Sequence, residues 1–136
     1  MNLIPILLGL IGLFAAYLLY KVVKSYPAGD KKLTDISDEI HIGAMAFMKK
    51  EYSILFVFSL ILVFGIYLGL GFSSTVAFIV GAVTSSVTGF IGMYTATKAN
   101  VRTATAAQNS GVSDSLSVAF FGGSIMGLTV AAMGLL

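Results

Sequence analysis

The chain has 136 residues, of which 57% are hydrophobic and 10% are charged, and its mean hydropathy is +0.97. Soluble domains carry about 25% charged residues, so this composition excludes a water-soluble globular protein. The sequence contains no cysteine, which excludes a disulfide framework, an iron-sulfur cluster and thiolate zinc ligation. A net charge of +2 is too small to indicate a nucleic-acid partner.

Three long segments of the sequence contain no charged residue, namely residues 1–20, 52–97 and 115–136. A helix needs about 20 apolar residues to cross a hydrocarbon core of ~30 Å, so the middle segment is long enough for two crossings. We therefore predict an all-α membrane protein of one membrane segment, residues 1–136, with four transmembrane helices at approximately 3–24, 53–71, 74–97 and 116–136. The first is expected to be a retained span, because no basic residue precedes it as in a signal peptide.

Residues 25–52 and 98–115 are the predicted polar connections. Pro27 to Gly29 should end the first helix, and Thr34 is a candidate N-cap for a helix that runs from about Asp35 to Leu70. Part of that helix would stand outside the lipid. Glycines and hydroxyls from Gly69 to Thr75 favour a tight reversal between the second and third spans.

The basic residues predict the orientation of these spans. All of them fall in the first and third connections or at their edges, and the second connection has none. The positive-inside rule therefore predicts that residues 25–52 and 98–115 are cytoplasmic and that the N- and C-termini lie on the non-cytoplasmic side. The basic residues are Lys21, Lys24, Lys31, Lys32, Lys49, Lys50, Lys98 and Arg102.

Small residues recur at helical spacing in the last two spans. Such stripes let helix backbones approach closely within a membrane, so we predict that they pack against other helices; a hinge or pore lining is the alternative. The second span is rich in phenylalanine and leucine instead, which favours a lipid-facing position. The predicted packing residues are Gly81, Ser85, Gly89, Gly92, Gly123 and Gly127.

Few residues are candidates for chemistry. The acidic group of Asp30, Asp35, Asp38 and Glu39 could bind magnesium, but acidic residues at a helix start are more typical of capping. His41 could sense pH, although a lone histidine on an amphipathic helix is more often solvated. Lys98 and Arg102 could bind an anionic substrate or anchor a helix at the headgroups. Taken alone, the residues predict no catalytic, cofactor-binding or metal-ligating group.

Four stretches of this sequence resemble the membrane-integral inorganic pyrophosphatases, an ion-translocating family. Ile36 to Tyr52 is similar to the helix leading into the family's second span. The other three are similar to its third and fourth spans: Gly89 to Met93, Ala96 to Ala104 and Ala119 to Leu128. The resemblance covers essentially the whole chain.

The resemblance implies the N-terminal outer-ring helices of a longer, homodimeric pump. That family hydrolyses pyrophosphate at a magnesium-dependent cytoplasmic site and exports protons or sodium ions. Its magnesium- and pyrophosphate-binding motifs lie on later helices, so no catalytic residue is carried over. We expect the 136-residue chain to be a cut segment, inactive by itself, and part of a multi-pass protein of a prokaryotic cell membrane.

The resemblance also implies a supporting role around the catalytic bundle. Lys98, Asn100 and Arg102 are the residues expected to brace the cytoplasmic site from outside. The expected partners are the remaining helices of the pump, a second copy of the complete enzyme, and the lipid bilayer. The alternative is a free-standing four-helix membrane protein that acts as an assembly partner or a small transporter, although it lacks the intramembrane carboxylate that transporters commonly use.

Overall fold

A computed structural model describes residues 3–136 of the chain, and Met1 and Asn2, which carry the predicted non-cytoplasmic N-terminus, lie outside the described residues. The described part forms three helices: α1 (Leu3–Ser25), α2 (Lys31–Asn109) and α3 (Val112–Leu135). Each of the three is long and apolar enough to cross a membrane. The prediction of an all-α protein is confirmed, whereas the predicted set of four separate helices becomes three among residues 3–136.

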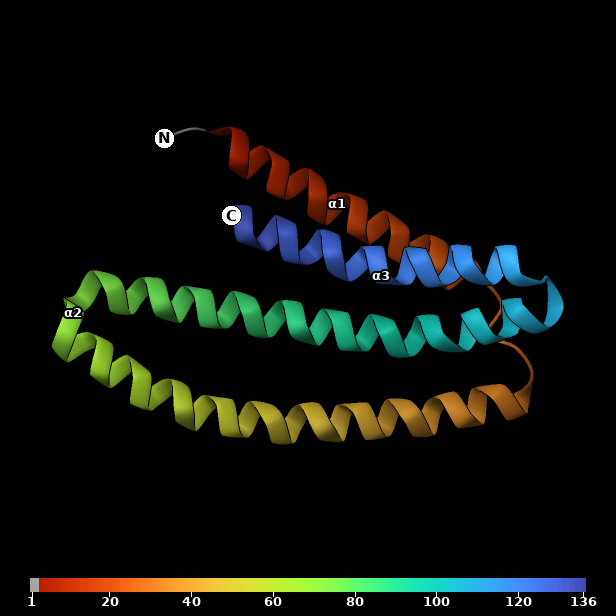
Figure 1. Cartoon of the computed structure of the whole chain (residues 1–136), viewed down its shortest axis with the longest axis horizontal. Helices are drawn as coiled ribbons and strands as arrows, with labels where there is room; N and C mark the ends of the chain where they lie inside the picture. The colour runs from red at the N-terminus through yellow and green to blue at the C-terminus, as the bar shows by residue number, and fades with distance from the viewer. Residues whose placement is uncertain (1–2) are drawn as a thin grey trace.

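The difference in helix number arises at Gly71. This residue has φ 81° and ψ −177°, a backbone conformation open essentially only to glycine. Figure 1 shows α2 folding back on itself there, so that residues 31–70 (the first arm) run antiparallel to residues 72–109 (the second arm). Within the expected loop from Gly69 to Thr75, this one non-helical residue makes the reversal.

The other helix ends follow local sequence signals. α1 stops at Ser25, two residues before Pro27, as expected. The prediction of Thr34 as N-cap is wrong, because the side chain of Asp30 caps α2 by accepting a hydrogen bond from Leu33 N at 2.9 Å. Thr34 lies inside the first turn of the helix, where its hydroxyl donates to the carbonyl of Lys31 at 2.9 Å.

The helices pack through α3, which contacts both α1 and α2 extensively, while α1 and α2 touch each other sparsely. Buried side chains from all three helices meet in one core, formed by Ala16, Val23, Ala99 and Ile125. Because α1 is held mainly by α3, the side of α1 that faces the second arm of α2 is incompletely filled. Two cavities lie in this gap, each lined by α1 on one side and by the second arm of α2 on the other.

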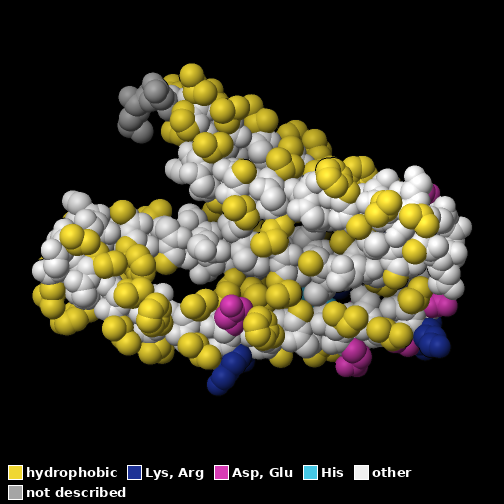
Figure 2. Space-filling model, viewed as in Figure 1, with side chains coloured by type: hydrophobic (Ala, Val, Ile, Leu, Met, Phe, Trp, Pro, Cys, Tyr) yellow, Lys and Arg dark blue, Asp and Glu magenta, His cyan; other side chains and the backbone are white. Residues whose placement is uncertain are grey.

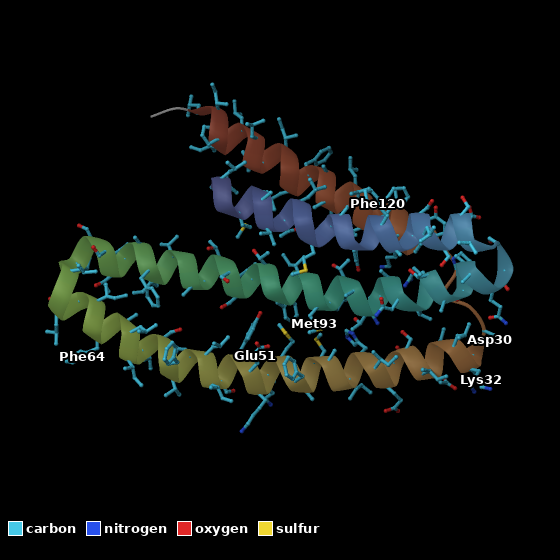
Figure 3. The ribbon with its side chains drawn as sticks, viewed as in Figure 1. Asp30, Lys32, Glu51, Phe64, Met93 and Phe120 are labelled. Atoms are coloured by element: carbon cyan, nitrogen blue, oxygen red, sulfur yellow. The ribbon has the colours of Figure 1, made fainter. Side chains whose placement is uncertain are left out.

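Two contacts fix the register of the arms of α2. Tyr52 donates its hydroxyl hydrogen to the carbonyl of Ser86, and His41 Nδ1 lies 2.8 Å from Thr97 Oγ1. The end of the expected third span therefore lies beside the polar segment 41–51. The apolar face of the first arm points outward, as Phe64 does in Figure 3, and 67% of that side chain is exposed.

Candidate functional site

A basic cavity lies at the end of the bundle where α1 leads into the loop before α2. Its volume is about 240 Å³, and its polar lining groups are Tyr20 and Lys24 from α1 and Tyr94, Lys98 and Arg102 from the second arm. Residues four positions apart share one face of a helix, so the spacing of these residues aims both sets into the same space. We call it the basic cavity.

Arg102 holds the wall of this cavity in place. Its Nε donates to the carbonyl oxygen of Tyr26 at 3.1 Å, and its Nη1 donates to that of Lys98 at 2.7 Å. The bond to Tyr26 ties the second arm to the chain immediately after α1, and the bond to Lys98 holds the guanidinium against its own helix. A guanidinium has five N–H donors, so about three remain for other partners.

The basic cavity can hold an anion. It is lined by three basic residues, Lys24, Lys98 and Arg102, and among the residues that the structure describes no carboxylate residue lines it. Hydroxyl groups of Tyr20 and Tyr94 add hydrogen-bonding capacity. Convergent cations and donors of this kind are the ordinary means by which proteins bind phosphate groups.

The predicted bracing residues occupy two different sides of the second arm. Lys98 and Arg102 come together at the basic cavity. Asn100 is separate from them and lines a cavity of about 120 Å³ between the arms of α2, together with Leu33 and Ser37 of the first arm. The stretch from Lys98 to Arg102 therefore contacts both the α1 side and the first arm.

The sequence favoured a solvated surface position for His41, and the structure shows a different one. The histidine is half-buried, its Nδ1 lies 2.8 Å from Thr97 Oγ1, and its ring meets the Tyr94 ring edge-on at a centroid distance of 5.4 Å. The Thr97 hydroxyl donates its only hydrogen to the Tyr94 carbonyl at 2.9 Å. His41 Nδ1 is therefore the donor to Thr97, and this bond exists in both the neutral and the protonated histidine.

The acidic residues at the start of α2 have separate local roles. Asp30 caps the helix, and Figure 3 shows it with Lys32 at the point where the loop enters α2. Asp35, Asp38 and Glu39 are exposed. In Figure 2 the visible charged side chains lie along the first arm and at this end of the bundle. Within residues 3–136 no three histidine or carboxylate side chains gather to hold a metal ion, so these residues do not fit a magnesium site.

The predicted packing residues divide by their surroundings. An ideal Cβ on Gly92 would lie 2.7 Å from the Met126 sulfur, and one on Gly89 would lie 3.1 Å from the Tyr52 hydroxyl. Added Cβ atoms on Gly81, Gly123 and Gly127 would meet no other described atom within 4 Å. Ser85 is exposed and lines a cavity of about 350 Å³ between the second arm and α3.

The tightest contact between small residues of α2 and α3 was not predicted from the sequence. An ideal Cβ on Gly122 would lie 2.7 Å from the Cβ of Ala99, and both residues are buried. The predicted stripe of the fourth span lies one residue later, on Gly123. The adjacent Gly122-Gly123 pair offered two possible stripes, and only the position of the partner helix selects between them.

Comparisons with known proteins identify the family of this chain. A sequence model of the family described as "Inorganic H+ pyrophosphatase" matches residues 10–136. The chain is 41% identical over 123 residues to a putative K(+)-stimulated pyrophosphate-energized sodium pump of Clostridium tetani, which covers 90% of this chain and 18% of the relative. It is 39% identical over 133 residues to a K(+)-insensitive pyrophosphate-energized proton pump of Methanosarcina mazei, covering 96% of this chain and 20% of the relative.

A third relative, the K(+)-stimulated pyrophosphate-energized sodium pump of Thermotoga maritima, is 37% identical over 124 residues, which are 90% of this chain and 17% of the relative. The chain thus spans about a fifth of the length of the curated relatives it matches. Its apolar helices and these relatives identify a multi-pass integral membrane protein. Because the family match extends over nearly the whole chain, this protein belongs to the inorganic H+ pyrophosphatase family.

Proposed function

We propose that this chain forms the N-terminal, outer-ring helices of a membrane pyrophosphatase that couples pyrophosphate hydrolysis to export of protons or sodium ions from the cytoplasm. The observation that carries the proposal is its identity of 39–41% over at least 90% of its length with relatives named as pyrophosphate-energized pumps. In the complete, homodimeric enzyme these helices pack around the catalytic bundle and support it. Lipid covers the outward-facing first arm.

The chemistry of hydrolysis belongs to other parts of the pump. The carboxylates of the described residues act as a helix cap or are exposed, and they do not converge on a magnesium site. Magnesium, when bound, would neutralise charge on the pyrophosphate oxygens. Because such a site needs clustered oxygen ligands, we expect residues 1–136 alone to hydrolyse no pyrophosphate.

The proposed membrane arrangement has four crossings: α1, the two arms of α2, and α3. Both loops, at 26–30 and 110–111, lie at the same end of the bundle, and the reversal of α2 lies at the opposite end (Figure 1). The basic residues fall near the loop end or along the arms that lead to it. This supports a cytoplasmic position for residues 25–52 and 98–115, with both chain ends outside.

The second arm carries the proposed support. Arg102 is bonded to the Tyr26 carbonyl, which fixes the loop between α1 and α2. Asn100 lies against the first arm. Lys98, Asn100 and Arg102 would thus hold both neighbouring elements in position beneath the catalytic bundle, by connecting structural elements and without contacting pyrophosphate.

Arg102→Ala in the full-length pump tests this role. The substitution removes hydrogen bonds to two carbonyl groups, and a bond to a charged group contributes about 1.5–3 kcal/mol, so assembly or activity should fall. The measurements are the abundance of the folded pump, pyrophosphate hydrolysis and ion uptake in inverted membrane vesicles. Lys32→Ala, at an exposed residue of the same charge, is the matched control. Unchanged hydrolysis, pumping and abundance in Arg102→Ala would remove the assignment.

A further inference from the structure

The basic cavity adjoins an apolar groove between α1 and the second arm of α2. This groove has a volume of about 360 Å³, and Leu13, Ala16 and Tyr17 of α1 face Phe90 and Ile91 of the second arm across it. Side chains of α3 form its floor, namely Ile125 and Thr129. Tyr20 and Tyr94 line both the groove and the basic cavity, so the two spaces adjoin at these side chains.

The length of the combined space matches one leaflet of a bilayer. From Leu13 to Lys24 there are eleven helical steps, which at 1.5 Å each extend about 16 Å along α1. Half of a ~30 Å hydrocarbon core is about 15 Å. The apolar part lies toward the middle of α1 and the cationic part lies at its loop end, which is the order of an acyl chain and a headgroup.

We propose that this groove binds an anionic phospholipid, with its phosphate in the basic cavity and one acyl chain between α1 and the second arm. Lys24, Lys98 and the free donors of Arg102 would neutralise the phosphate. The Tyr20 and Tyr94 hydroxyls stand at the junction, where the ester groups of a lipid lie. The proposal adds a lipid ligand to the supporting role described above and does not depend on the reaction of the pump.

Charge complementarity favours this occupant over the others. A free anion would use only the basic cavity and would leave the apolar groove empty. A zwitterionic lipid would bring an ammonium group to a cavity that, among the described residues, no carboxylate lines. A further helix of the pump would need an acidic side chain to match the same cations. An anionic lipid satisfies both regions at once.

Photo-crosslinking of the full-length protein tests the proposal. The protein is reconstituted in phosphatidylcholine vesicles that contain a trace of phosphatidylglycerol with a diazirine on its acyl chain, and adducts are mapped by mass spectrometry. Adducts should form on residues 13–20 and 90–95. Diazirine-labelled phosphatidylcholine should label the same residues much less, and millimolar inorganic phosphate should not displace the phosphatidylglycerol probe.

Two charge variants make the test specific. Each cation near a membrane surface contributes about fivefold to binding of an anionic lipid, so Lys24→Gln with Lys98→Gln should weaken labelling by about twenty-five-fold. Lys32→Gln with Lys50→Gln removes two exposed cations outside the groove and should leave labelling unchanged. Neither pair alters the Arg102 side chain, whose bonds hold the loop.

Three results would overturn the proposal. Equal labelling by the anionic and the zwitterionic probe would remove the charge preference. No adduct on either segment would indicate that another part of the pump covers the groove. Displacement of the probe by inorganic phosphate would identify a site for free anions. In each case the supporting role tested by Arg102→Ala would be judged separately, by hydrolysis and pumping.

Discussion

Hydroxyl side chains satisfy most of the buried polar positions in this chain within their own helices. Thr88, Thr105 and Thr129 are each buried and donate to the carbonyl four residues earlier, at 2.7–2.8 Å. In the described residues no buried side-chain nitrogen or oxygen lacks a hydrogen-bond partner. A membrane helix can bury such residues at little cost in free energy, because its own backbone supplies the acceptor and no neighbouring helix has to. His41 and Thr97 differ, because their contact joins the two arms of α2.

Replacing His41 should loosen the arms of α2. His41→Phe keeps an aromatic ring against Tyr94 but removes the donor to Thr97, so we expect a loss of about 1 kcal/mol in the free energy of unfolding. The measurement is denaturant unfolding of the full-length protein in detergent. Thr97→Val and the double variant complete a mutant cycle, and a coupling energy near zero would contradict a direct interaction.

At the scale of helices, the sequence predicted what depends on local signals. Charge-free runs located the apolar helices, Pro27 located the end of α1, and the glycine-rich stretch located the reversal at Gly71. The N-cap was misplaced because Asp30 and Thr34 are both competent caps only four residues apart, and the structure uses the first. Contacts between helices carried no local signal, so the facing partner of Gly122 could not be inferred.

Two adjacent glycines in α3 should respond oppositely to alanine. In Gly122→Ala the new Cβ would meet the Ala99 Cβ at 2.7 Å, so the helices must separate and we expect a loss of about 1–3 kcal/mol. Among residues 3–136 no atom outside its own helix backbone and chain neighbours lies within 4 Å of an ideal Cβ on Gly123, so Gly123→Ala should stabilise the helix by as much as about 1 kcal/mol. Thermal unfolding of the full-length protein in detergent measures both. Equal shifts for the two variants would refute the assigned contact between α2 and α3.

At the scale of the whole molecule, α3 determines where the functional groups meet. The spacing of Lys98 and Arg102 was visible in the sequence, but the groups from α1, Tyr20 and Lys24, join them only because α3 holds α1 beside the second arm. The sequence therefore showed the helical spacing of the residues on one wall of the basic cavity, but it predicted neither the opposite wall nor the cavity itself. The rest depends on tertiary packing between segments more than 70 residues apart in the chain, as in the bond from Arg102 to Tyr26, which spans 76 residues.

Cysteine labelling distinguishes a hairpin from a single crossing by α2. This chain has no cysteine, so Lys32→Cys, Ser73→Cys and Gln108→Cys can be introduced singly into a cysteine-free full-length protein, and all three positions are exposed. A membrane-impermeant maleimide applied to intact cells should label only Ser73→Cys, whereas Lys32→Cys and Gln108→Cys should react only after permeabilisation. Their shared protection follows from the reversal at Gly71, which returns both ends of α2 to one face of the membrane. A straight α2 would place residues 32 and 108 on opposite faces, so labelling of one but not the other in intact cells would exclude the hairpin and the four-crossing arrangement built on it.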